Sequence, residues 1–130
     1  MSASAPQRHI RVVGVLPEKR EEYLRLHEVV WPDVEARLTA SGITNYSIFI
    51  LGDRLISYYE YVGDDYEADM ALIAADPVTQ EWWTLTDPCQ VPVPEAGEGE
   101  LWADATVVAP PLTPHPRVER GSTRGAVSTR

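Results

Sequence analysis

The chain has 130 residues and a formal net charge of −9, and 44% of its residues are hydrophobic. This length fits one domain with a small core. The acidic balance disfavours phosphate backbones and anionic membrane surfaces, whereas a neutral small molecule is compatible with it. We therefore expect no nucleic-acid partner and no membrane partner.

Cysteine content and apolar runs indicate the compartment. Cys89 is the only cysteine, so no intrachain disulfide or zinc cluster can be built from it, and a reducing compartment is the simplest interpretation. Residues 1–8 lack the apolar run of a secretory signal. No apolar stretch approaches the roughly 20 residues that a membrane span needs. We expect a soluble, cytoplasmic protein.

The amino-terminal part predicts a tail followed by a strand. Residues 1–8 are small and polar and are expected to be a disordered tail. Residues 9–16 are rich in β-branched side chains, which predicts the first strand. Gly14 inside this strand indicates a bulge or the close approach of another backbone.

A helical segment follows the first strand. Pro17 suits the first helical turn, and Gly42 is a good helix terminator. Apolar and aromatic residues recur at helical spacing between them. Pro32 removes a hydrogen bond from a helix interior. We therefore predict either a kink near residues 27–31 or two helical pieces, the second beginning at Pro32.

Residues 43–51 and 54–62 predict two strands joined by a Gly52-Asp53 turn, and hence an antiparallel pair. Side chains alternate between the two faces of a strand. In the first of these strands, one face therefore carries Tyr46, Ile48 and Ile50, and the other carries Ser47, Phe49 and Leu51.

The next segment predicts two further helices. Asp65 suits the cap of a helix over residues 65–75. Asp76-Pro77 predicts the cap and first residue of a shorter helix that carries Trp82 and Trp83. Asp64-Asp65 is more readily explained as a helix cap than as a catalytic pair.

The remaining sequence predicts a loop, a strand and a tail. Residues 87–99 hold many prolines and glycines and predict a long loop, and residues 100–108 predict the last strand. Residues 113–130 have no periodicity and are expected to be a disordered tail. Residues 9–112 then form the single domain.

The predicted order of elements is strand, helix, strand, strand, helix, strand. This order predicts an α+β fold, the ferredoxin-like split βαβ sandwich, with one antiparallel sheet and both helices on one face. In so small a domain, the opposite face of the sheet also has to be buried against another surface. The sheet of a second copy would supply it, so we expect a homodimer.

His27 is the strongest candidate for proton chemistry. His9 lies at the ragged start of the chain and His115 in the predicted tail, so His27 is the only histidine expected in an ordered element. Tyr23 lies one helical turn earlier, on the same face. Imidazole titrates near neutral pH and can give or take a proton. A structural histidine, on the helix surface or hydrogen-bonded in the core, is the alternative.

Aromatic residues supply the other candidates. Trp82 and Trp83 point about 100° apart on a helix, so at most one sits squarely in the core and the other is exposed or lines a cleft. Core and dimer-interface packing is the alternative. Tyr46 opens a strand, where its hydroxyl can reach a cleft. Tyr59, like its neighbours on the same strand, is assigned to packing.

Several kinds of site are not predicted. The sequence has no Gly-rich phosphate loop and no nucleotide fingerprint. It offers no ordered pair of histidines, so we expect no metal. Cys89 has no activating cation nearby in sequence and is not predicted to be a nucleophile. The expected pocket holds one imidazole, phenols and indoles, and it can do acid–base chemistry on a neutral ligand without a cofactor.

Four short motifs in one order resemble the L-rhamnose mutarotase family over about residues 11–108. They are Tyr23-x-x-x-His27, Trp31-Pro32-Asp33, Asn45-Tyr46-Ser47-Ile48, and Gln80-x-Trp82-Trp83 with Thr86-Asp87. The resemblance implies a dimeric α+β barrel that interconverts the α and β anomers of L-rhamnose, or of a closely related 6-deoxyhexose such as L-fucose, without a cofactor. It also implies that His27 is the proton donor. The sugar contacts that it implies are Tyr23, Tyr46, Trp82 and Trp83.

Two other functions fit the same sequence. A small monooxygenase-like enzyme is one, because the fold hosts several functions; it predicts turnover of an aromatic substrate. A non-catalytic sugar-binding dimer is the other, and it predicts sugar binding that survives His27→Ala.

Overall fold

The structure is a computed structural model that describes residues 5–109. The elements follow in the order β1 (Gln7–Val15), a 3₁₀ turn (Pro17–Lys19), α1 (Arg20–Leu26), α2 (Pro32–Ala40), β2 (Ile43–Leu51), β3 (Arg54–Tyr61), α3 (Tyr66–Ala75), α4 (Pro77–Thr86), a second 3₁₀ turn (Asp87–Cys89), β4 (Gln90–Val91) and β5 (Ala103–Asp104). The predicted tail 113–130 lies outside the described residues. The first strand begins at Gln7 rather than His9, because its pairing with β3 continues to Gln7 and Tyr61.

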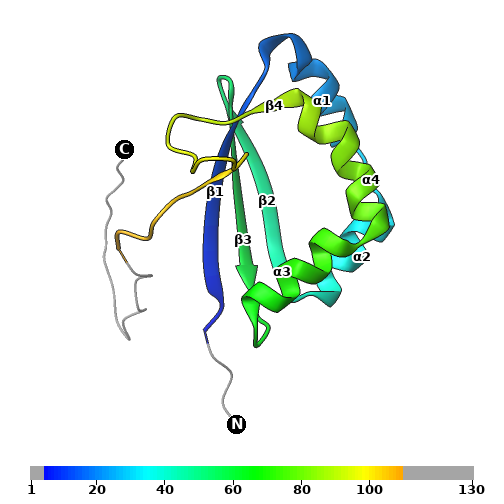
Figure 1. Cartoon of the computed structure of the whole chain (residues 1–130), viewed down its shortest axis with the longest axis vertical. Helices are drawn as coiled ribbons and strands as arrows, with labels where there is room; N and C mark the ends of the chain where they lie inside the picture. Colours follow the sequence, from blue (N-terminus) through cyan, green and yellow to red (C-terminus); the bar gives the residue numbers. More distant parts are fainter. Residues whose placement is uncertain (1–4, 110–130) are drawn as a thin grey trace, which may run out of the picture.

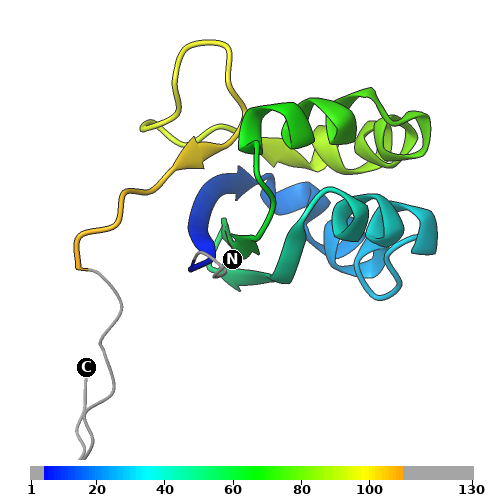
Figure 2. The ribbon, with the colours of Figure 1, turned by 90° about the horizontal axis from the view of Figure 1, so that it is seen from below.

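The strands form one antiparallel sheet in the order β2-β3-β1-β4, and β5 also pairs with β1. All four α-helices lie on one side of this sheet (Figure 1). Seen from below, they form two rows, α1 with α2 and α3 with α4 (Figure 2). This arrangement confirms the predicted ferredoxin-like α+β fold.

The first helical segment consists of two pieces, as one of the two alternatives predicted. The helix α1 ends at Leu26, and α2 begins with Pro32 in its first turn. A proline at this position loses no intrahelical bond, since the first amides of a helix have no partner anyway. His27 closes α1, and its amide donates to the carbonyl groups of Tyr23 and Leu24, both at 3.2 Å.

Capping residues start α3 and α4 as predicted. The side chain of Asp65 accepts a hydrogen bond from the amide of Ala68 at 3.1 Å. Asp76 accepts from the amide of Thr79 at 2.9 Å, and Pro77 follows it. These carboxylates satisfy amides that the first helical turn leaves unpaired.

The last edge of the sheet differs from the prediction. Only Ala103–Asp104 of the expected strand 100–108 is a strand, and Gln90–Val91 is a strand inside the expected loop 87–99. Val91 pairs with Gly14, and a continuous ladder would next pair Val93 with Val12. Ala103 takes that place, so a long loop interrupts one edge strand.

Gly14 explains where the first half of this edge attaches. A Cβ at Gly14 would stand 2.9 Å from the carbonyl oxygen of Val91. This distance is shorter than ordinary contact, so the predicted close backbone approach is confirmed. Because Pro88 and Pro92 flank β4, the sequence pattern there predicted a loop rather than a strand of two residues.

The core lies between the sheet and the helices. One cluster joins Val13, Val15, Tyr23, Leu55 and Cys89. A second cluster joins Ile43, Tyr59, Tyr61 and Ile73. No helix within residues 5–109 has the length and apolar character needed to cross a membrane.

Candidate active site

Tyr23 and His27 form the centre of the site. Their rings stack with centroids 4.2 Å apart and an interplanar angle of 26°. Tyr23 is buried in the core, and His27 is half-buried at the end of α1. The predicted pairing of phenol and imidazole on one helix face is therefore present.

A backbone contact fixes the proton on the His27 ring. Nδ1 of His27 lies 3.1 Å from the carbonyl oxygen of Tyr23. Because a carbonyl only accepts, Nδ1 carries the hydrogen and Nε2 is the nitrogen left for a ligand. Burial lowers the pKa of His27 below its ordinary value of 6.5, and the smaller effect of the carbonyl opposes this. At neutral pH the imidazole is uncharged, with its lone pair on Nε2.

Trp82 from α4 completes the aromatic wall beside His27. Its ring meets the His27 ring edge-on, with centroids 5.3 Å apart, and it meets the Trp31 ring at 5.2 Å. Trp82 is only 6% exposed, whereas Trp83 is 37% exposed. One tryptophan is therefore in the core and the other is at the surface, as their spacing predicted. Among the described aromatic contacts, none joins Trp83 to this cluster.

A β-bulge turns Tyr46 toward the site. Thr44 pairs with Glu60 and Ser47 with Tyr58, so Asn45 and Tyr46 together stand opposite Tyr59. Asn45 has φ 52°, a left-handed conformation that asparagine tolerates. The extra residue shifts the alternation. Tyr46, Ile48 and Ile50 share one face, as predicted, and the bulge places this face toward the helices.

The ring of Tyr46 stacks on the ring of Tyr59, with centroids 5.4 Å apart. Tyr46 is 42% exposed, and its partial burial raises the pKa of its hydroxyl. Burial also raises the pKa of Tyr23, and the neighbouring phenol of Tyr46 adds to this rise. The two hydroxyls thus lie near each other and stay protonated at neutral pH.

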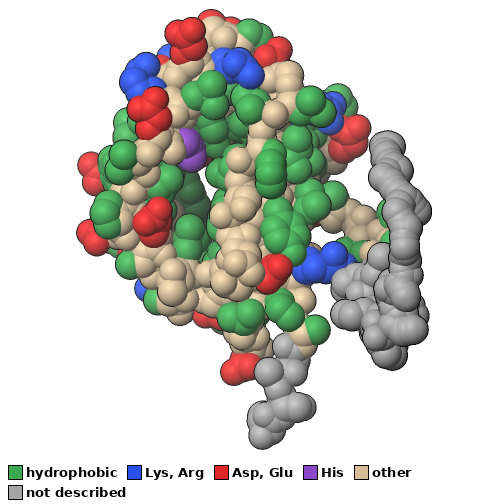
Figure 3. Space-filling model, turned by 180° about the vertical axis from the view of Figure 1, so that it is seen from behind, with side chains coloured by type: hydrophobic (Ala, Val, Ile, Leu, Met, Phe, Trp, Pro, Cys, Tyr) green, Lys and Arg blue, Asp and Glu red, His purple; other side chains and the backbone are tan. Residues whose placement is uncertain are grey.

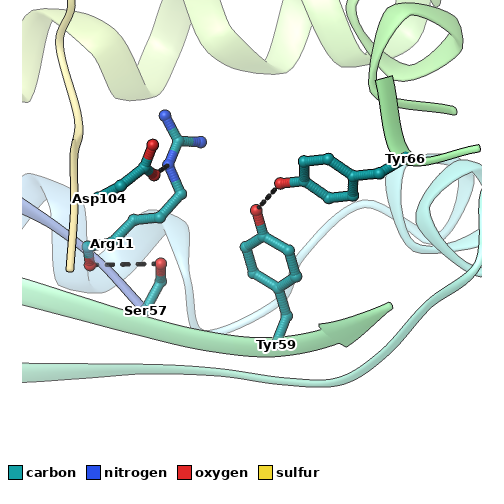
Figure 4. Close-up of polar contacts among 5 residues, drawn as sticks. All are labelled: Arg11, Ser57, Tyr59, Tyr66 and Asp104. Atoms are coloured by element: carbon teal, nitrogen blue, oxygen red, sulfur yellow. Dashed lines mark hydrogen bonds and ion pairs between the residues drawn. The ribbon is translucent and has the colours of Figure 1, made fainter. Parts of the chain in front are cut away.

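The far end of the helix-facing sheet surface is polar (Figure 4). The hydroxyls of Tyr59 and Tyr66 lie 2.6 Å apart, and burial raises the pKa of Tyr59. Nε of Arg11 donates to Asp104 at 3.1 Å. The Tyr59 ring also stacks on the Tyr46 ring, so the polar end adjoins the candidate site.

His9 corrects one expectation. It belongs to β1 and is therefore a second histidine in an ordered element. Its ring stacks on Tyr66 at 4.4 Å and on Tyr59 at 5.1 Å between centroids. The pairing of His9 with Tyr59 across the sheet explains this contact, because paired residues share a face. Side chains alternate between the two faces of a strand, so counting back from the buried Val13 would have placed His9 on the same face.

The surface is hollowed between the helices and the sheet, and hydrophobic side chains line the hollow (Figure 3). Within residues 5–109, no group of three or more histidine, cysteine or acidic side chains could hold a metal ion. Cys89 is buried, and burial raises the pKa of its thiol. Around His27, the candidate site thus brings together a neutral imidazole, protonated phenols and indole rings.

A family model and curated relatives connect this chain with sugar mutarotases. The family model described as "rhaM: L-rhamnose mutarotase" matches residues 8–108. An L-rhamnose mutarotase of Pectobacterium carotovorum is 32% identical over 99 residues, covering 72% of this chain and 94% of that protein. An L-fucose mutarotase of Xanthomonas campestris is 40% identical over 88 residues, covering 65% of this chain and 70% of that protein.

A solved structure supports the fold. The L-rhamnose mutarotase FA22100 of Formosa agariphila superposes with a TM-score of 0.62 at 19% identity. The superposition covers 79% of this chain and 96% of the other. At this identity the likeness concerns the fold alone.

Proposed function

The chain belongs to the L-rhamnose mutarotase family, a family of isomerases that act on sugar anomers, and we propose that it interconverts the α and β anomers of L-rhamnose or a closely related 6-deoxyhexose. The observation that carries this proposal is the meeting of Tyr23, His27 and Trp82, from two helices, in a chain that matches the family model.

His27 is the proposed proton carrier. Anomers exchange when the sugar ring opens to the aldehyde and closes on its other face. In opening, Nε2 of neutral His27 takes the proton of the anomeric hydroxyl, the carbonyl forms, and the bond from the anomeric carbon to the ring oxygen breaks. The imidazolium then gives its proton to the ring oxygen. Both oxygens are bonded to one carbon, so one nitrogen beside that carbon can serve both.

The tyrosines and tryptophans are proposed to hold the sugar. The phenols of Tyr23 and Tyr46 stay protonated and can donate hydrogen bonds to sugar oxygens. The Trp82 ring, beside His27, offers an apolar surface for the C–H face of a sugar. Trp83 is exposed and is assigned to the rim of the site.

The preferred sugar has to be determined by experiment, because similar relatives are named for different sugars. Relatives named for L-rhamnose and for L-fucose both resemble this chain. We propose L-rhamnose as the first substrate to test and L-fucose as the second.

Saturation-transfer NMR tests the proposal. It follows exchange between the two anomers of L-rhamnose with the native protein, with His27→Ala and with His9→Ala. We expect faster exchange with the native protein and a loss of about 10²- to 10⁴-fold in His27→Ala. His9→Ala is the matched control, because it also removes an imidazole stacked on a tyrosine.

The outcomes separate the alternatives. Equal acceleration by native protein and His27→Ala would remove His27 from its role but keep the activity. Sugar binding without any acceleration would favour a non-catalytic sugar-binding dimer. Neither binding nor exchange with L-rhamnose or L-fucose would overturn the proposed function, and turnover of an aromatic compound would then favour the monooxygenase-like alternative.

A further inference from the structure

Gln90 carries a buried oxygen that nothing in the fold satisfies. Oε1 of Gln90 is the single side-chain nitrogen or oxygen atom among residues 5–109 that is buried without a hydrogen-bond partner. Buried polar atoms in proteins nearly always have partners, so an exception calls for an explanation. A ligand hydroxyl is one partner that could satisfy it.

The sheet directs this side chain toward the site. Gln90 pairs with Val15 in the antiparallel ladder, and paired residues project to the same face. Val15 is buried in the cluster that contains Tyr23. The side chain of Gln90 therefore enters the layer between sheet and helices, beside the proposed site.

The Gln90 backbone is held firmly in place. The 3₁₀ turn Asp87–Cys89 precedes it, and the carbonyl of Cys89 accepts a hydrogen bond from the amide of Leu16 at 2.9 Å. Cys89 itself is buried. The backbone of Gln90 is thus held by hydrogen bonds of the turn before it and of the sheet.

The amide group of Gln90 lies near the phenol of Tyr23. The Gln90 side chain acts to lower the pKa of the Tyr23 hydroxyl, against the larger opposite effect of burial. Gln90 is therefore a neighbour of one of the proposed sugar contacts.

We propose that Gln90 is a further substrate-binding residue, whose Oε1 accepts a hydrogen bond from a sugar hydroxyl. This inference rests on the proposed function and deepens it. A site that hydrogen-bonds a substrate hydroxyl disfavours analogues that lack it or place it differently. Gln90 would thereby help to choose among 6-deoxyhexoses.

Two variants test the proposal. Gln90→Leu removes both polar ends at similar size, and Gln90→Glu keeps an acceptor but removes the N–H donor. The measurements are the dissociation constant of each sugar by NMR titration, the anomer exchange rate, and thermal unfolding. The panel is L-rhamnose, L-fucose and the monodeoxy derivatives of L-rhamnose.

We expect Gln90→Leu to weaken L-rhamnose binding about tenfold. For the one monodeoxy sugar that lacks the contacted hydroxyl, the same variant should bind as the native protein does. Thermal unfolding should occur at no lower temperature, because an apolar group replaces an unsatisfied one. Gln90→Glu should retain more affinity than Gln90→Leu.

The opposite results would overturn the role of Gln90. An unchanged dissociation constant in Gln90→Leu would do so, and so would an equal loss for every sugar together with a lower unfolding temperature. Failure of the proposed function is distinguishable, since the native protein would then bind sugar without speeding exchange and the binding comparison would still be readable. A native protein that binds no sugar of the panel would overturn both proposals.

Discussion

His27 and His9 occupy similar aromatic surroundings and differ in one contact. Burial lowers the pKa of both imidazoles, and each ring stacks on tyrosine. Nδ1 of His27 is tied to a backbone carbonyl of its own helix at 3.1 Å. The ring of His9 instead lies 3.4 Å from the side chain of Gln7, which is exposed. Of these two histidines, His27 alone has a ring nitrogen hydrogen-bonded to the backbone, which leaves its Nε2 for a ligand.

The lowered pKa of His27 predicts how activity depends on pH. The neutral imidazole is the form that accepts the proton in ring opening. It is the main form at every pH above the pKa of His27, which lies below 6.5. We expect the exchange rate to fall as pH decreases through that pKa and to be level at neutral pH. The measurement is the saturation-transfer rate as a function of pH, beside the His27 titration followed by NMR.

His9→Ala controls for the other histidine, whose pKa is shifted in the same direction. The acid limb of the profile should persist in that variant. A rate that increases toward acid pH would show that the imidazolium form starts the reaction, and the neutral-base step would then be wrong.

At the scale of elements, a break between two helices and a bulge in one strand position the side chains of the site. The interruption between α1 and α2 leaves His27 at a helix end, and Trp31 precedes Pro32 at the start of the next helix. The bulge at Asn45 brings Tyr46 onto the same sheet face as Tyr59. A strictly regular helix and strand would separate these side chains.

The bulge can be tested through Asn45. Its φ of 52° disfavours residues with a Cβ, and its side chain donates to Glu60 at 2.9 Å. We expect Asn45→Ala to lower the free energy of unfolding by about 1–2 kcal/mol. Asn45→Gly is the matched control, because it loses the same side-chain hydrogen bond but adopts this backbone freely.

Denaturant unfolding measures both variants. A clearly smaller loss in Asn45→Gly than in Asn45→Ala would assign the effect to the backbone conformation. Equal losses would assign it to the contact with Glu60 instead.

At the scale of the molecule, no helix within residues 5–109 covers the second face of the sheet. Val12, Ile56 and Phe49 lie side by side across three strands on the face opposite the helices. Phe49 is 58% exposed and Leu51 is 74% exposed. An apolar sheet face of this kind is typical of an interaction surface. We propose that a second copy of the chain covers it, which would form a homodimer.

Phe49→Arg tests the dimer. A charge in the centre of a buried interface is strongly disfavoured, so we expect this variant to be monomeric where the native protein is dimeric. Sedimentation equilibrium over a range of concentrations measures the mass. Leu72→Arg is the control, since Leu72 is 52% exposed on α3, away from this face. A monomeric native protein would contradict the proposal.

The sequence by itself determined the order of the elements as far as α4, the break at Pro32, the caps at Asp65 and Asp76, and the shared helix face of Tyr23 and His27. These features depend on residues within a turn or two of each other, where backbone sterics and helical spacing are decisive. It also indicated that one tryptophan of Trp82 and Trp83 is buried.

Only the tertiary structure decided which distant residues meet. Trp82 reaches His27 from another helix, Gln90 reaches Tyr23 from an edge strand of two residues, and His9 joins Tyr66 from the far end of the chain. Such contacts arise because separate elements bury their apolar faces against one another, and local patterns do not encode the partner. The divided edge strand escaped prediction for the same reason, since its two halves are strands only where β1 supplies hydrogen bonds.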